Sequence, residues 1–226
     1  SSNTIAGATT FANTGTVTLG NGSDTINFTG GVIATAPSAI TVNGTITAAG
    51  TGVITLGDSN TGVTIGGAST IGSTSTGTIT MGAIALNNNL TLGAGVATPI
   101  SLTTVTGPSS STANLTFDTA GSITVSGAIG TNVGTLTITN SGGATFSGTV
   151  AASTVTLTNT TGTITFAGAL TATTLNTAAQ AYNLALNAST GTITNAVTFS
   201  NTGTLALGAS GGTLTFNGGL TATAPS

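Results

Sequence analysis

From Leu115 onward the sequence reads as three consecutive lines: LTFDTAGSITVSGAIGTNVGT, then LTITNSGGATFSGTVAAST from Leu136, and VTLTNTTGTITFAGALTATT from Val155. Each line holds an apolar-Thr-apolar piece, a polar turn with a glycine, a second apolar-Thr-apolar piece and a Gly-x-apolar tail. Alternation of β-branched or aromatic residues with Thr predicts short strands that are buried on one side. A repeat of about twenty residues built from such strands is typical of a β-solenoid.

The same pattern extends over most of the 226 residues. Three short strands in each coil of about twenty residues predict an all-β, three-sided parallel β-helix with roughly 10–11 coils. The regular spacing of the hydrophobic residues, 38% of the chain, argues against disorder. The stretch from Gly93 to Asn114 contains two prolines and predicts a loop or a distorted coil. The segment from Ala178 to Tyr182 is a second candidate insertion.

A longer repeat connects the two ends of the chain. Residues 1–38 align without a gap onto residues 189–226, and 21 of the 38 aligned positions are identical, which exceeds what a shared Gly and Thr bias explains. Neither end resembles the polar cap of a free-standing solenoid. We therefore expect residues 1–226 to be one segment of a longer array, with residues 1–188 as one unit of about nine coils and residues 189–226 as the start of a second copy.

The charge inventory excludes several partners. The chain has no Lys, Arg or His, no Cys, and three acidic residues, for a net charge of −3. Phosphate binding depends on Lys and Arg, so nucleic acid is not expected as a partner. No apolar run is long enough to predict insertion into a membrane. So little charge leaves a surface that tolerates self-association, either end-to-end or lateral, into a homo-oligomer or filament.

Very few side chains offer catalytic or metal-binding chemistry. The candidates are Asp24, Asp58, Asp118 and Tyr182. Each Asp lies in a predicted turn without a second carboxylate nearby in sequence, whereas acid–base catalysis and calcium sites gather several such groups. Asp118 also aligns with Asn140 and Asn159, which indicates a position that favours turn formers. We expect no enzyme activity, no metal site and no cofactor.

The Thr-x-Thr pieces give one sharper hypothesis. Stacking of coils at about 4.8 Å predicts two columns of exposed threonines on separate faces. The first column consists of Thr116, Thr137 and Thr156, and the second of Thr124, Thr145 and Thr165. Flat arrays of this kind suit an ice-binding surface, although Thr is also a common exposed residue in strands.

The lines LTITNSGGATFSGTVAAS and TLTNTTGTITFAGALTATTL resemble the repetitive passengers of filamentous-haemagglutinin-like and autotransporter-type bacterial surface proteins. This resemblance implies a right-handed parallel β-helix that is secreted to the extracellular side or the cell surface. The combined expectation is a structural protein that forms a rod, fibre or sheath component. The alternatives are an adhesin that binds glycans or surfaces through its irregular loops, and an ice-binding protein.

Overall fold

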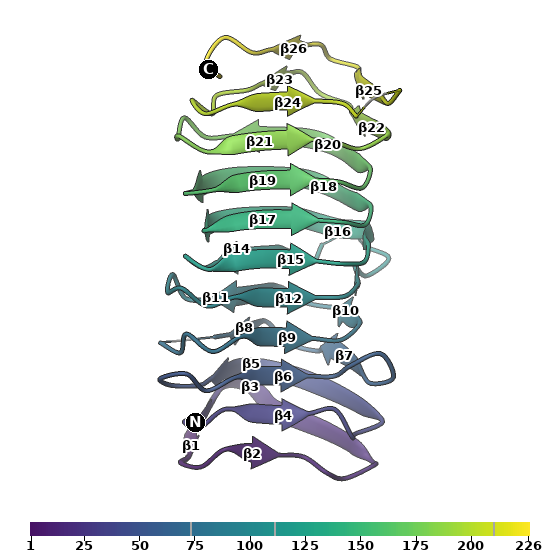
Figure 1. Cartoon of the computed structure of the whole chain (residues 1–226). Helices are drawn as coiled ribbons and strands as arrows, with labels where there is room; N and C mark the ends of the chain where they lie inside the picture. The colour runs from purple at the N-terminus through teal and green to yellow at the C-terminus, as the bar shows by residue number, and fades with distance from the viewer. Residues whose placement is uncertain (73, 111, 210) are drawn as a thin grey trace.

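A computed structural model of the chain describes residues 1–72, 74–110, 112–209 and 211–226. Over these residues the secondary structure consists of strands and turns without a helix, and each strand pairing is parallel. The strands stack into a solenoid of about ten coils with about 21 residues per coil, with the two ends of the chain at opposite ends of the rod (Figure 1). The all-β parallel solenoid expected from the sequence is confirmed.

The coil has three faces. Face 1 is the ten-stranded sheet. The fourteen-stranded sheet bends around a corner and supplies the other two faces, because residues 39–42 of strand β5 pair with β7 while Thr45 and Ile46 pair with β8. We name the side that contains β7 face 2 and the side that contains β8 face 3.

Face 1 carries one strand from each coil. Its strands are β2 (Thr9–Thr10), β4 (Val32–Ala34), β6 (Ile54–Leu56), β9 (Ile79–Met81), β12 (Ile100–Leu102), β15 (Ser122–Val125), β17 (Gly143–Phe146), β19 (Thr163–Phe166), β21 (Asn183–Leu186) and β24 (Leu205–Leu207). Viewed with the N-terminus at the bottom, these front strands run from left to right while the chain rises, so the coil is right-handed (Figure 1).

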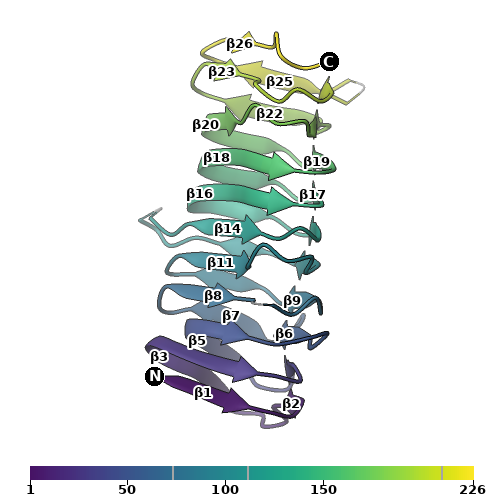
Figure 2. The ribbon, with the colours of Figure 1, turned by 90° about the vertical axis from the view of Figure 1, so that its left-hand side faces the viewer.

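Faces 2 and 3 share the strands that cross their common corner. These long strands are β3 (Thr16–Phe28), β5 (Ala39–Thr47), β16 (Ile129–Ser141), β18 (Val150–Thr160) and β20 (Leu170–Thr177). Face 2 alone holds β7 (Gly62–Ile65), β10 (Ile84–Leu86), β13 (Val105–Thr106), β22 (Thr190–Ile193) and β25 (Thr213–Phe216). Face 3, turned toward the viewer in Figure 2, holds β1 (Ser2–Ile5), β8 (Ser69–Ile71), β11 (Leu90–Gly93) and β14 (Leu115–Asp118). It continues into β23 (Val197–Thr198) and β26 (Leu220–Thr221), which form a separate two-stranded sheet.

The interior is a single hydrophobic core that runs along the axis. Alternate residues of each strand point inward, as in β6 and β9, where the outer two residues are buried and the central Thr is half-buried. Like residues stack on like residues between coils: Phe146 lies on Phe166 with parallel rings 4.9 Å apart. Burial of these side chains is the main favourable term in the stability of the coil.

The recurring glycine of the Gly-x-apolar tail has a packing reason. At the turn between faces 1 and 2, a Cβ atom on Gly168 would lie 2.1 Å from the carbonyl oxygen of Gly148. A Cβ on Gly148 would in turn lie 2.4 Å from the carbonyl group of Gly127. The backbones of successive coils meet here without room for a side chain, so glycine stacks on glycine.

Two predicted irregularities are more ordered than expected. Within Gly93–Asn114, β12 and β13 pair in register with the coils on both sides, so the expectation of a loop or distorted coil is wrong for that part. Within this stretch, the loop between β13 and β14 extends away from the body (Figure 2), and residue 111 lies outside the described residues. The segment Ala178–Tyr182 is a turn whose last residue, Tyr182, is fully buried.

The 188-residue repeat preserves its strand pairings. Ser2 pairs with Thr25, and their counterparts Thr190 and Thr213 pair in the same way. However, β1 lies on face 3 and its counterpart β22 on face 2, so the offset is one side short of nine coils. The offset is therefore close to the nine coils expected, and the division of the chain into repeat units stays a prediction.

We expect Gly168→Ala to lower the stability of the fold by roughly 1–3 kcal/mol, because the new methyl group has to displace the Gly148 backbone. For a chain of this length each kcal/mol corresponds to about 2–4 °C in the melting temperature. Thermal unfolding followed by circular dichroism measures the shift. Gly130→Ala is the matched control, since a Cβ there lies 3.5 Å from the nearest atom, the Val105 carbonyl oxygen. Equal melting temperatures for the two variants would contradict the packing argument.

Candidate functional site

Face 3 carries an unbroken column of outward threonines. Strand register places Thr116 beside Thr91 on one side and Thr137 on the other, and Thr137 beside Thr156. The three candidate residues from the sequence are thus brought together, each half-buried between its neighbours. The column is longer than the sequence analysis proposed. We call it the face 3 column; its members are Thr25, Thr45, Thr70, Thr91, Thr116, Thr137 and Thr156.

A shorter second column lies two residues earlier in each strand. Thr135, Thr154 and Thr174 pair in register there, so residues 135–137 and 154–156 each present a Thr-x-Thr pair. Asn114 and Asn195 end this column. The Asn114 side-chain oxygen accepts from the Thr135 N–H at 2.8 Å, and the Asn195 side-chain amide donates to the Thr174 hydroxyl at 3.0 Å. The two-column array therefore covers only a few coils.

Face 1 carries the second predicted column. Thr124, Thr145 and Thr165 stack in register, with the first two exposed and the third half-buried. The column extends toward the N-terminus through Ser101 and ends at Ala185, where the hydroxyl is replaced by a methyl group. The full set of face 1 hydroxyls is Thr55, Thr80, Ser101, Thr124, Thr145 and Thr165. The two candidate triplets thus lie on different sides of the coil.

A third set of hydroxyls points into the core at the corner between faces 3 and 1. The Thr119 hydroxyl donates to the carbonyl oxygens of Thr98 and of Val96, the latter at 2.9 Å, and the Thr98 hydroxyl donates to the Ser75 carbonyl oxygen. In later coils the Ser141 and Thr160 hydroxyls bond to one another at 2.7 Å. The sequence analysis missed this buried column, because its members look like ordinary turn residues.

The three aspartates lie apart. Asp24 lies within β3 and Asp118 ends β14, so the expectation of a turn is wrong for these two, whereas Asp58 lies in the turn between β6 and β7. Asp24 contacts the amino group of Ser1 at 2.8 Å, and this hydrogen bond lowers the pKa of the carboxyl group. Asp58 accepts from the N–H groups of Asn60 and Thr61, which closes its turn. Asp118 pairs in register with Asn140. Over the described residues no cluster of acidic side chains is suited to holding a metal ion.

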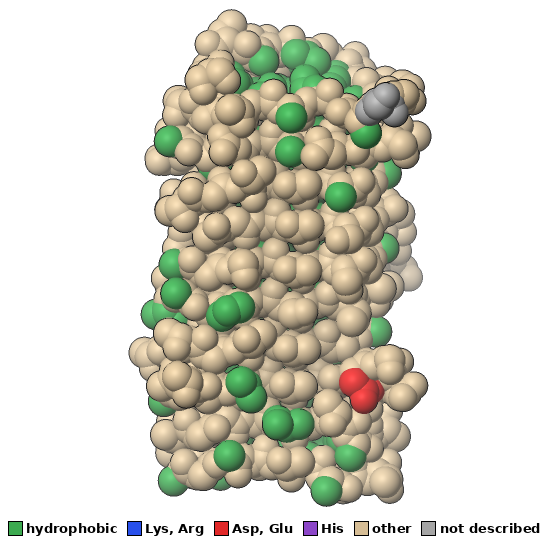
Figure 3. All heavy atoms as spheres, in the orientation of Figure 1, with side chains coloured by type: hydrophobic (Ala, Val, Ile, Leu, Met, Phe, Trp, Pro, Cys, Tyr) green, Lys and Arg blue, Asp and Glu red, His purple; other side chains and the backbone are tan. Residues whose placement is uncertain are grey.

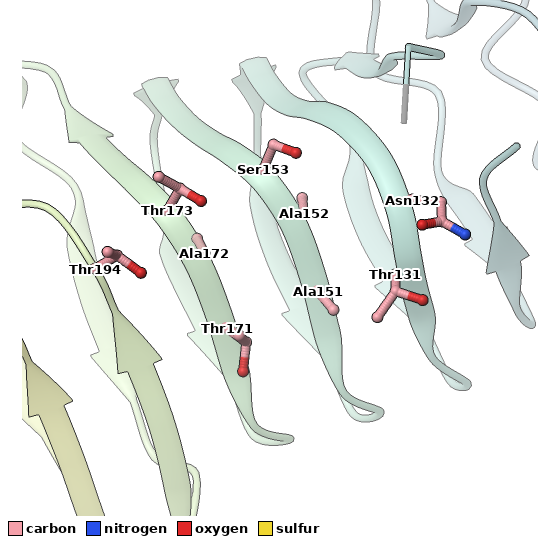
Figure 4. Close-up of a pocket in the computed structure, with 9 residues that line it drawn as sticks. All are labelled: Thr131, Asn132, Ala151, Ala152, Ser153, Thr171, Ala172, Thr173 and Thr194. Atoms are coloured by element: carbon pink, nitrogen blue, oxygen red, sulfur yellow. The ribbon is translucent and has the colours of Figure 1, made fainter. Parts of the chain in front are cut away.

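A shallow depression of about 210 Å³ lies on face 2, where Thr171, Thr131 and Ser153 surround a floor of Ala151, Ala152 and Ala172 (Figure 4). A bulge in β16 between Ile129 and Val133 forms one wall, and Asn132 in this bulge adopts a φ of 75°. The lining is neutral, so the depression offers hydroxyl, amide and methyl groups. None of these groups is suited to transferring a proton at neutral pH.

The comparisons with known proteins do not assign the chain to a family, so its class is defined by the fold. No family model matches the chain, and neither does any curated protein or solved structure. Among the described residues there is no helix long and apolar enough to span a membrane. The molecule is a parallel β-solenoid, and its resemblance to the bacterial surface proteins stays a hypothesis. The absence of enzyme activity and of nucleic-acid partners likewise stays a prediction.

Because of Tyr182, the free energy of unfolding should decrease with rising pH in the alkaline range. Its ring is fully buried, its hydroxyl donates to the Leu157 carbonyl oxygen at 3.4 Å, and burial raises its pKa to about 12. The unfolded chain releases this proton near pH 10, so the contribution is complete below pH 10 and is lost as the pH rises to 12. We expect the free energy of unfolding to fall by about 2–3 kcal/mol over this range.

Chemical denaturation at several pH values measures this decline. The chain has one Tyr and no Lys, Arg, His or Cys, so no other side chain titrates in this window. Tyr182→Phe should therefore remove the decline while leaving the coil folded at neutral pH. An unchanged pH dependence in this variant would contradict the assignment.

Proposed function

We propose that the protein is a structural component of a secreted, extracellular rod, fibre or sheath. The observation that carries this proposal is the continuous core with its parallel backbone ladders, which run from one end of the described chain to the other. About ten coils at about 4.8 Å correspond to a rod of roughly 50 Å. Neighbouring coils share hydrogen bonds along the whole length, so bending requires distortion of many bonds at once.

The surface chemistry supports an association role. Its polar groups are mainly Thr, Ser and Asn side chains, and Figure 3 shows one face of the molecule almost free of charge. A net charge of −3 gives little repulsion between copies, so contacts between molecules meet a small electrostatic barrier. A role as part of a filamentous-haemagglutinin-like or autotransporter-type surface protein belongs to the same proposal and rests on the repeat pattern and the parallel β-solenoid.

Electron microscopy and analytical ultracentrifugation of the purified chain test the structural role. We expect stiff rods that associate into longer or wider particles as the concentration rises, because neither charge nor a bulky side-chain layer opposes contact. Rods that stay monomeric at high concentration would argue against a self-associating material. Flexible or collapsed particles would argue against a mechanical role altogether.

A second candidate function is ice binding through the face 3 column, whose seven threonines stand in one unbroken register. This candidate predicts thermal hysteresis in solution. Thr137→Tyr should abolish most of it, because a large side chain disrupts the flat array, whereas Thr145→Tyr on face 1 should leave it intact. Absence of thermal hysteresis in the unmodified chain rejects this candidate and leaves the structural proposal in place. The adhesin alternative would instead be supported by glycan-array binding that requires the loop between β13 and β14.

A further inference from the structure

Face 2 is a sheet face whose outward strand positions hold only small side chains. Over the described coils these positions form two columns, which we call the face 2 columns. The first contains Thr16, Ala39, Gly62, Ala83, Thr104, Ala128, Thr149, Ala169, Thr190 and Thr213. The second, two residues later in each strand, contains Thr18, Thr41, Thr64, Ala85, Thr106, Gly130, Ala151, Thr171, Thr192 and Thr215.

The other two faces carry longer side chains among their outward residues. On face 3, Asn27 lies beside Thr47, and Asn176 follows Thr156 in the register. On face 1, Ile33 is exposed in the centre of β4. Face 2 therefore differs from faces 1 and 3, because no side chain in the face 2 columns is larger than Thr.

Face 2 is level or slightly hollow along the rod. The depression of about 210 Å³ described above lies over β16, β18 and β20. A second depression of about 410 Å³ lies over β7 and β10, where the lining includes Gly62, Ala83 and Ala85. Successive coils lie above one another with little rotation (Figure 1), so the face stays on one side of the rod. Its shape suits a second flat surface that can approach the sheet closely.

The size of face 2 matches that of a stable protein interface. Ten strands contribute to it, from β3 to β25. At about 4.8 Å per strand and about 15 Å of strand length, the face covers roughly 700 Å². Two such faces in contact bury about 1,400 Å² in total, and specific interfaces bury about 1,200–2,000 Å². Face 2 of a second copy is therefore a large enough partner.

The cost of burying face 2 is low. Its columns contain no charged group, and Gly and Ala have no rotamer freedom to lose. The backbone groups of the strands already pair between coils, so contact with another sheet leaves the ladder intact. The Thr106 hydroxyl donates to the Ile84 carbonyl oxygen at 3.2 Å. A face 2 hydroxyl can thus find a partner within its own sheet when water is excluded.

We propose that face 2 is the lateral contact surface of the rod and that it binds face 2 of a second copy. This inference rests on the proposed self-association and specifies the face that carries it. The same surface is used on both copies, so the contact is isologous and closes at a pair of rods lying side by side. Cryo-electron microscopy of the assembled chain should show such pairs, with the two facing sheets about 10 Å apart or closer.

Glutamate substitutions test the contact in the 226-residue chain. Thr106→Glu and Thr171→Glu each place a charge in the centre of face 2, where two copies would bring like charges together. Each should raise the dissociation constant of the pair by about tenfold or more, measured by sedimentation velocity. Thr124→Glu and Thr145→Glu on face 1 are the matched controls, because they add the same charge at exposed strand positions and should leave the constant unchanged. Circular dichroism establishes that each variant retains its strands.

Protection of single cysteines gives a second readout. The chain has no Cys, so an introduced thiol is the only one to react with a maleimide. The reaction of Thr64→Cys and Thr171→Cys should slow as the protein concentration rises and face 2 becomes covered. The reaction of Thr145→Cys should keep the same rate at all concentrations.

Four results would overturn the inference. Assembly that is lost in the face 1 variants and kept in the face 2 variants would place the contact elsewhere and leave the self-associating rod intact. Equal loss in all four variants would show an effect of charge rather than of position. Lateral bundles of more than two rods would reject an isologous contact. A wild-type chain that stays monomeric at all concentrations would reject both this contact and the self-association on which it rests.

Discussion

The parallel backbone ladder between coils is the constraint on which the rest of the structure depends. It holds successive coils at about 4.8 Å and places each residue beside its equivalent in the next coil. Thr137 therefore stacks on Thr116, and Phe166 on Phe146. A side chain that suits one coil suits its neighbours, which explains why the same short sequence pattern recurs.

The ladder makes its strictest demands at the turns. Where backbones approach most closely, as at Gly148 and Gly168, the distance excludes a Cβ atom. Where a turn leaves carbonyl groups facing the core, inward hydroxyls such as that of Thr119 satisfy them. Burying a carbonyl group without a hydrogen-bond partner costs free energy, so these hydrogen bonds allow the carbonyl groups of the corner to be buried. At the corner between faces 1 and 2, glycine is required because there is no room for a side chain. At the corner between faces 3 and 1, threonine is favoured because its hydroxyl donates to carbonyl oxygens.

The sequence predicted the strands and the fold class well, because alternation and like-on-like stacking are both visible in a single repeat. Thr124 and Thr145 were recognised as outward residues since they lie between apolar residues in a strand. Thr98 and Thr119 were not recognised as inward residues, because alternation does not apply in turns. Pro99 suggested an irregular coil, yet it precedes β12 and its carbonyl oxygen accepts from the Ile79 N–H. Proline is tolerated at such a strand start.

The coil count shows why a long repeat is harder to interpret than a short one. The sides of the solenoid differ in length, so a 188-residue offset does not reveal from sequence how many sides it spans. The structure places equivalent strands β1 and β22 on different faces. The change of face therefore belongs to the 188-residue repeat, whereas the shorter coil repeat keeps the threonines of the face 3 column on one side. We rank the structural function above ice binding because the second threonine column beside it covers only a few coils and ends at Asn114 and Asn195.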